Sequence, residues 1–176
     1  MILPIVTAPQ SVLSTPTRQI TTIDKKIREL IRDMTDTLLS CKDPLGVGLA
    51  APQVGVPLAL CIVKPTRKSP VEVFINPKIV AFSNKKTIHK STLEGCLSIP
   101  KVWSHVNRPT TVDVEYETME GVKLRRHITG YEAHIIQHEV DHLNGVLFTH
   151  QALSQHQPFY TIKRKNGEEE FVEMEL

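Results

Sequence analysis

Apolar residues along the chain follow two spacings, one typical of helices and one typical of strands. Over residues 23–40 they recur every three or four positions, which places them on one face of an amphipathic helix. We expect Thr22 to cap this helix and Asp43-Pro44 to mark its stop. Residues 1–20 are interrupted by prolines and are expected to be irregular.

The middle of the chain consists of short β-rich runs bounded by turn residues. The expected strands are Leu58–Lys64, Val71–Ile75, Val112–Tyr116 and Val122–His127. In the tail, Asn166-Gly167 is the preferred sequence of a two-residue hairpin turn. Four facing pairs are expected around it: Lys165 with Glu168, Arg164 with Glu169, Lys163 with Glu170, and Ile162 with Phe171. Three of the pairs join opposite charges, which supports this register.

A second helix is expected to begin after Thr129 and to run to about Leu143. Thr129 and Glu132 fit a capping box, and Asn144-Gly145 fits a left-handed C-terminal cap. Antiparallel or mixed strands around this central helix, one N-terminal helix and a C-terminal β-hairpin indicate an α+β fold. Because the chain has no repeat and no long linker, residues 1–176 are expected to form a single domain.

The central helix carries the strongest chemical signal, the run HEVDH at 138–142. Histidines four positions apart project from one helix face, so His138 and His142 can chelate one metal ion. Glu139 lies one position on, where its carboxylate can reach a water on the metal rather than the metal itself. The alternative is a pair of surface histidines on a polar helix, because this short pattern often arises by chance.

A catalytic metal site of this kind needs a third protein ligand. His134 lies on the same helical stripe, but about 12 Å separates residues eight apart, too far for His134 and His142 to bind one ion. The remaining candidates are Cys41, Cys61, Cys96, His89, His105, His127 and His150. Cys96 stands out because it lies in a turn of small residues, whereas Cys41 and Cys61 are expected to be buried hydrophobes.

Three motifs together resemble the signatures of one enzyme family. GVGLAAPQ at 46–53, EGCLS at 94–98 and QHEVDHLNG at 137–145 are similar to the motifs of peptide deformylases, in order and in spacing. The resemblance implies a hydrolase that removes the formyl group from the N-terminal methionine of newly made polypeptides and releases formate. It also implies that Cys96, His138 and His142 hold one divalent ion, iron(II) in the family, with zinc, nickel or cobalt as alternatives.

The same resemblance assigns roles around the metal. Glu139 would act as general base, while the Gln53 side chain and the backbone N–H of Leu97 would stabilise the oxyanion. Gly46 and Gly48 would let the substrate peptide lie in an extended, strand-like conformation. The pocket for the methionine side chain would be formed by Val47, Tyr131, His134 and Ile135.

The chain departs from the family pattern in several places, two of which lie at the substrate groove and in the tail. After the EGCLSIP run the family often has a glycine, or an arginine two residues further on, where this chain has Lys101-Val102-Trp103. Many members end in a helix, whereas this tail predicts a hairpin. Neither difference touches the metal ligands or the base, so both bear on peptide preference.

Composition and charge narrow the setting. A formal net charge of +2 with scattered basic residues does not favour specific nucleic-acid binding, and no apolar run is long enough for a membrane span. Three cysteines do not suggest a disulfide framework. We therefore expect a cytoplasmic protein. The resemblance to peptide deformylases implies nascent N-formyl-methionyl peptides as its substrates and the ribosome near its exit tunnel as a further partner, and we expect it to be a monomer.

Two other functions compete with this interpretation. A generic zinc metallopeptidase accounts for the histidine pair but gives no role to Cys96 or Gln53. A non-catalytic homologue that only binds peptides does not require Glu139.

Overall fold

The computed structural model describes residues 1–42, 45–84, 93–165 and 168–175. Its helices are α1 (Lys25–Ser40), α2 (Gly130–Leu143) and α3 (Phe148–Ser154), with 3-10 turns η1 (Ser11–Ser14) and η2 (Ala51–Val54). One antiparallel sheet contains β1 (Gly48–Ala50), β2 (Leu60–Val63), β3 (Glu72–Phe82), β6 (Thr111–Glu117) and β7 (Lys123–Thr129), in the order β1-β2-β3-β6-β7. The other contains β4 (Glu94–Cys96), β5 (Ile99–Ser104), β8 (Phe159–Lys165) and β9 (Glu168–Glu173), in sequence order.

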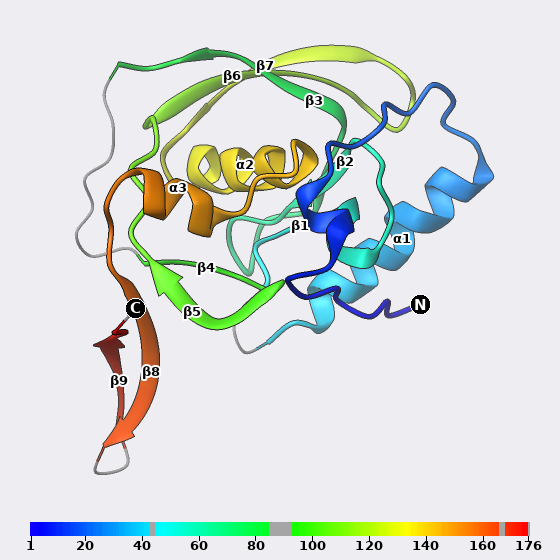
Figure 1. Cartoon of the computed structure of the whole chain (residues 1–176). Coiled ribbons are helices and arrows are strands. Elements are labelled where there is room, and N and C mark those ends of the chain that lie inside the picture. The colour runs from blue at the N-terminus through cyan, green and yellow to red at the C-terminus, as the bar shows by residue number, and fades with distance from the viewer. Residues whose placement is uncertain (43–44, 85–92, 166–167, 176) are drawn as a thin grey trace.

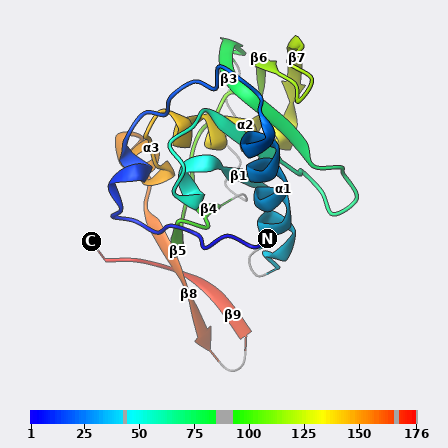
Figure 2. The same ribbon diagram turned by 90° about the vertical axis from the view of Figure 1, so that its right-hand side faces the viewer.

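The central helix α2 lies between the two sheets. Strands β3, β6 and β7 arch over it in Figure 1, while β4 and β5 pass beneath it. Its apolar residues pack against the five-stranded sheet in one buried cluster that includes Phe74, Val112, Val114, Ile128, Ala133, Ile136 and Val140. Helix α1 packs on the same sheet at the β1–β2 end, through a second cluster (Figure 2). The α+β class is therefore confirmed, with the metal-binding helix at the centre.

Strand β3 is longer than the sequence pattern predicts. The expected strand ended at Ile75, but β3 continues to Phe82 through Asn76-Pro77, where its pairing with β6 shifts register. Asn76 has a left-handed φ of 51°, and its side-chain amide binds the backbone N–H and C=O of Ile20 at 2.8 Å each. Asn-Pro ordinarily marks a turn, and here it forms a bulge inside a strand.

Helix α1 forms as expected but has a different cap. The Asp24 carboxylate accepts a hydrogen bond from the Ile27 N–H at 3.0 Å, so the prediction of Thr22 as N-cap is wrong. The helix ends at Ser40, and the expected stop at Asp43-Pro44 lies outside the described residues. The segment expected to be irregular, residues 1–20, contains the short turn η1.

Of the two caps predicted for α2, the C-terminal one forms and the N-terminal one does not. Thr129 occupies the N-cap position but makes no side-chain cap bond, and the Glu132 carboxylate instead accepts from Arg126 at 2.9 Å. The predicted capping box is therefore wrong. The C-terminal cap is confirmed, because Gly145 has a φ of 72° and its N–H donates to the His142 carbonyl at 3.1 Å.

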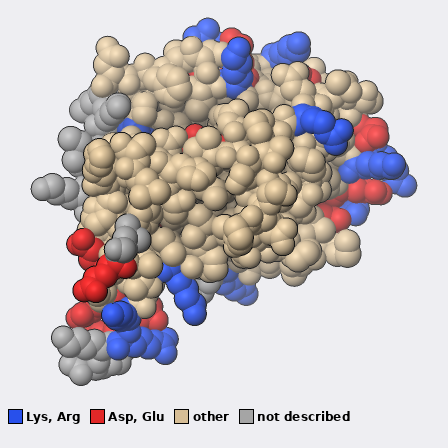
Figure 3. Space-filling view, in the orientation of Figure 1, with Lys and Arg blue, Asp and Glu red and all other residues tan. Residues whose placement is uncertain are grey.

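The C-terminal hairpin has the predicted register. Strands β8 and β9 pair Lys165 with Glu168, Arg164 with Glu169, Lys163 with Glu170 and Ile162 with Phe171, while Asn166-Gly167 lies outside the described residues. The hairpin projects from the body of the protein, and acidic and basic side chains lie side by side on it (Figure 3). Its β8 strand pairs with β5, which joins the tail to the sheet that begins at β4. In the described chain, no helix has the length and hydrophobicity that crossing a membrane requires.

Candidate metal centre

One thiol and two imidazoles meet beneath α2. Cys96 ends strand β4, and His138 and His142 project from one face of α2, as their spacing predicts. The Cys96 Sγ lies 3.2 Å from the His142 Nε2, and the candidate donor atoms of all three residues lie within 4.8 Å of one another. Cysteine, histidine and acidic side chains of the described residues converge in this way, as they would to hold a metal ion, at Cys96, His138 and His142.

The other candidates for the third ligand are engaged elsewhere in the described chain. Cys61 is fully buried in β2, and the Cys41 thiol donates to the Thr37 carbonyl at 3.3 Å. His127 binds the Asp113 carboxylate at 2.6 Å on the exposed side of the sheet. His105 packs edge-on against Tyr160, and His150 accepts from the Leu147 N–H. His89 lies outside the described residues.

Sequence reasoning missed Glu94, the buried acid that orients His138. The Glu94 carboxylate lies 2.5 Å from the His138 Nδ1, which leaves Nε2 of that ring as its ligand atom. Burial alone would raise the pKa of Glu94, but the Arg108 guanidinium holds it well below its usual range. Glu94 stands two residues before Cys96, so its place inside the EGCLS motif was the available signal.

Arg108 was also missed, and it joins the site to the rest of the fold. Its guanidinium donates two hydrogen bonds to Glu94, at 2.7 and 2.9 Å, and one to Asp141 at 2.8 Å. Gln151 of α3 donates to the same Asp141 carboxylate. Breaking such a buried pair typically costs about 3–5 kcal/mol, because it leaves a charge without a partner. The network thus holds β4, α2 and α3 in fixed positions around the triad.

The two candidate histidines differ in their affinity for protons. Burial lowers the pKa of His142 well below its ordinary value, which keeps the ring neutral as metal binding requires. Burial also acts against a charged His138, yet the adjacent Glu94 carboxylate raises the pKa of His138 well above the usual value. A metal ion therefore competes with a proton at His138.

Glu139 is a buried carboxyl group beside the triad. Only 3% of the residue is exposed, and burial raises its pKa to about 7. Within the described residues, two buried side-chain polar atoms have no hydrogen-bond partner. They are the Glu139 Oε2 and the His142 Nδ1. A carboxyl group poised near neutral pH with a free acceptor atom is suited to general-base chemistry.

The glycines of the 46–53 segment lie where neighbouring groups of the protein leave no room for a side chain. A Cβ at Gly48 would lie 2.8 Å from the Glu139 Cδ and overlap the carboxylate. A Cβ at Gly46 would lie 2.7 Å from the Leu38 Cδ1 of helix α1. These glycines are therefore required by close packing against Glu139 and α1, and the predicted approach of a substrate peptide to them stays a prediction.

We expect Gly48→Ala to lower kcat/KM by about 10²-fold, since displacing a catalytic group by about 1 Å has an effect of this size. The added methyl group must push the Glu139 carboxylate away from the triad. Gly121→Ala is the control: that glycine lies in an exposed turn where a Cβ meets no atom within 4 Å, although its φ of 77° makes the substitution strained. Formate release and metal content should be measured on both variants. Wild-type activity of Gly48→Ala would contradict this account.

Gln53 presents its amide to the same centre from η2. Its Oε1 accepts from the Ala50 N–H at 2.8 Å, which directs the Nε2 toward the Cys96 Sγ at 3.5 Å and the Ser98 Oγ at 3.3 Å. Leu97 follows Cys96 in the tight turn between β4 and β5. Both residues therefore lie next to the triad in the structure.

The four residues expected to form the methionine pocket lie in different environments. Ile135 is buried in the α2 cluster, and Val47 packs against that cluster. The His134 Nε2 lies 2.6 Å from the Glu94 carboxylate, so its ring belongs to the network behind His138. Tyr131 stacks on His134 and is 51% exposed, so its ring does not pack in the core.

Comparison with known proteins identifies the family. The sequence model of the polypeptide deformylase family matches residues 2–158. The chain is 42% identical to a peptide deformylase of Rhizobium meliloti over 149 residues, 82% of each protein. It is 37% identical to peptide deformylase 1 of Bacillus subtilis over 171 residues, 97% of this chain and 96% of that protein.

Solved structures agree with the sequence comparisons. The crystal structure of a peptide deformylase from Synechococcus elongatus in complex with actinonin superposes with a TM-score of 0.77 at 40% identity, covering 85% of this chain and 78% of that one. A class I type b peptide deformylase from Acinetobacter baumannii gives a TM-score of 0.78 at 33% identity, covering 86% and 99%. The chain therefore belongs to the peptide deformylase family and is a metal-dependent hydrolase that removes the N-formyl group from nascent peptides.

Proposed function

We propose that this chain hydrolyses the formyl group from N-terminal formyl-methionine and releases formate, with Cys96, His138 and His142 as metal ligands and Glu139 as general base. The observation that carries the proposal is the free Glu139 Oε2, buried and without a hydrogen-bond partner beside three converging ligand atoms. A buried carboxylate oxygen is ordinarily satisfied, so an exception next to such a group points to a reacting water as its partner.

The residues at this centre fit a resident divalent metal. A thiolate and two imidazoles, with the His138 Nδ1 already bound to Glu94, suit several first-row ions. We propose iron(II), with zinc, nickel or cobalt as alternatives. When bound, such an ion would acidify a water molecule and polarise the formyl carbonyl group.

The protein groups around the centre have separate tasks in this proposal. A Glu139 carboxylate oxygen takes the proton from the attacking water and later delivers it to the departing methionine nitrogen. The Gln53 Nε2–H and the Leu97 backbone N–H donate to the oxyanion that develops on the formyl oxygen. Losing one such preorganised donor typically costs about 3–4 kcal/mol of transition-state stabilisation.

The substrate peptide is proposed to lie in an extended conformation beside Gly46 and Gly48. Strand β1 ends the five-stranded sheet and β4 ends the four-stranded one, so among the described residues each has one edge without a partner strand, where an extended peptide can add. The wider setting is proposed as well: residues 1–176 act as one catalytic domain, in a cytoplasmic monomer that meets nascent chains near the ribosomal exit tunnel.

The methionine pocket gives a testable consequence. We expect His134→Leu to change the preference between formyl-Met and formyl-norleucine peptides, because it replaces a polar ring tip with an aliphatic group. One changed pocket contact typically alters kcat/KM by about 10- to 200-fold. Tyr131→Leu tests the outer part of the same wall. Unchanged preference in both variants would mean that these residues only support the network around Glu94.

Formate release from formyl-Met-Ala-Ser, paired with metal analysis of anaerobically purified protein, tests the proposed function. We expect formate release together with one ion per chain, and the analysis identifies the ion. A generic metallopeptidase would cleave internal peptide bonds instead, and a non-catalytic homologue would bind the peptide without turnover. Either outcome would overturn the proposal.

A further inference from the structure

One face of the four-stranded sheet carries a row of aromatic side chains. Gly95 pairs with Trp103, and Trp103 pairs with Tyr160 across the next strand. Residues paired on neighbouring antiparallel strands point to the same face, as do residues two apart along a strand. Phe171, paired with Ile162, therefore shares this face with Gly95, Trp103 and Tyr160. We call the side chains of Trp103, Tyr160 and Phe171 the aromatic face.

The indole ring of Trp103 occupies the space that a side chain at Gly95 would need. A Cβ at Gly95 would lie 2.6 Å from the Trp103 Nε1 and 2.7 Å from its Cδ1. The indole ring therefore covers the backbone of Gly95, the residue directly before Cys96. Trp103 itself is only partly buried.

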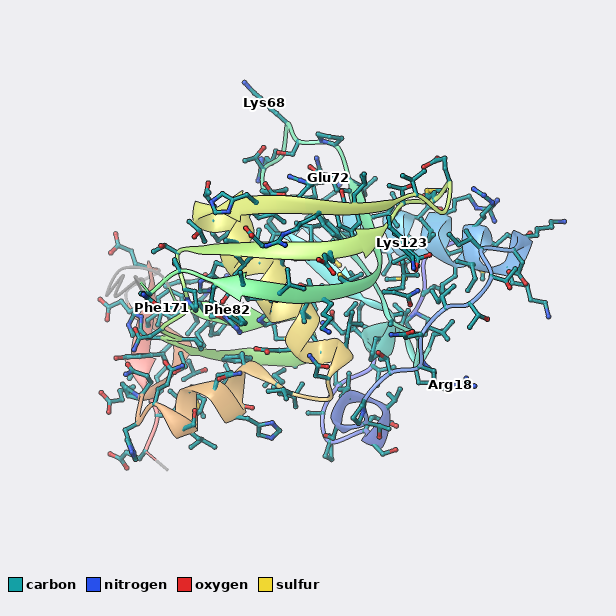
Figure 4. All side chains as sticks on the ribbon, turned by 90° about the horizontal axis from the view of Figure 1, so that it is seen from above. Arg18, Lys68, Glu72, Phe82, Lys123 and Phe171 are labelled. Atoms are coloured by element: carbon teal, nitrogen blue, oxygen red, sulfur yellow. The ribbon has the colours of Figure 1, made fainter. Side chains whose placement is uncertain are left out.

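The C-terminal hairpin supports this indole ring. The ring of Phe171 meets Trp103 edge-on, with centroids 5.4 Å apart and planes at 76°. Phe171 is 52% exposed, so its ring is available to solvent as well as to Trp103 (Figure 4). Phe171 lies about 70 residues after Trp103 in the sequence. Through this aromatic contact the C-terminal hairpin packs close to the metal centre.

The aromatic face continues from the outer edge of β4, which has no partner strand among the described residues and where we propose that an extended substrate adds. Side chains of an extended peptide point alternately to opposite faces. On β4, Glu94 and Cys96 point toward α2, and Gly95 points to the aromatic face. If the methionine side chain enters toward α2, the side chain that follows it is directed toward Trp103.

We propose that Trp103, held by Phe171, forms a subsite for an apolar or aromatic side chain directly downstream of the formyl-methionine. This inference rests on the proposed function. It assigns Trp103 a contact with the substrate and Phe171 a positioning role, and it makes the C-terminal hairpin a determinant of which nascent chains are processed fastest. The partly exposed indole and phenyl rings offer this side chain apolar surface and ring-to-ring contacts.

The test uses two peptide series, formyl-Met-Xaa-Ser and formyl-Met-Ala-Xaa, with Xaa as Phe, Leu or Asp. The wild-type enzyme should prefer Phe and Leu over Asp in the first series, where Xaa lies directly downstream of the formyl-methionine. Trp103→Ala should reduce that ratio of kcat/KM by about 2- to 12-fold, which corresponds to the ~0.5–1.5 kcal/mol of an aromatic pair. Phe171→Ala should shift the ratio in the same direction by less, and Phe171→Tyr should retain it.

Phe82→Ala is the matched control, because Phe82 is similarly exposed, at 59%, but ends β3 in the other sheet. Metal content should be equal in all variants, and Trp103→Phe replaces Trp103→Ala if the latter does not fold. Unchanged ratios in the formyl-Met-Xaa-Ser series for the Trp103 and Phe171 variants, or changes confined to the formyl-Met-Ala-Xaa series, would overturn the subsite. A wild-type enzyme that releases no formate from any peptide would instead refute the proposed function.

Discussion

Replacing Glu139 with glutamine is expected to lower turnover by about 10²–10⁴-fold, the range typical of a lost general base. Glutamine has nearly the same shape and should fit the same buried space against Gly48. Its amide cannot accept the proton of the attacking water. Since Glu139 is outside the Cys96–His138–His142 triad, the variant should still bind one ion per chain.

Formate release and metal content, measured on the same preparations, separate the two effects. Glu132→Gln is the matched control: it makes the same change on the same helix, at a residue that pairs with Arg126 rather than facing the triad. It should keep nearly wild-type turnover. Normal turnover in Glu139→Gln would show that another group activates the water, and loss of the ion would show that Glu139 contributes to binding it.

Features set by local sequence could be predicted well. Chelating histidines four residues apart, the left-handed cap at Gly145 and the hairpin register all depend on spacing within a few residues. The start of α1 also depends on local chemistry, but both Thr22 and Asp24 are good capping residues, so sequence alone could not choose between them. The capping box at Thr129 failed because Glu132 has a stronger partner in Arg126.

Features created by contacts between distant segments could not be predicted. Strands β1 and β4 have three residues each and contain glycine, so they form through pairing rather than through intrinsic preference. Glu94 and Arg108 stand 14 positions apart and resemble ordinary surface charges in the sequence. Only their burial together shows that they fix the orientation of His138. The resemblance to the family supplied Cys96 where spacing left seven candidates.

Substituting either Cys96 or His142 should abolish metal binding and, with it, nearly all formate release. Three protein ligands are the usual number for a catalytic ion, so Cys96→Ser or His142→Ala leaves two and sharply weakens the site. Binding to the folded state also stabilises it, by about 2.7 kcal/mol when the free ion is at 100 times its Kd. A chelator should therefore lower the thermal midpoint of the wild-type protein and leave both variants unchanged.

Cys41→Ser and His127→Ala serve as matched controls for this experiment, because each removes the same kind of side chain outside the triad. Both should bind one ion per chain and respond to the chelator as the wild-type protein does. Full occupancy in either ligand variant, or two ions per wild-type chain, would contradict the assignment. His138→Ala should lose the ion as well, but it also removes a partner of the buried Glu94 carboxylate, so a further fall in stability without added metal is expected for this variant.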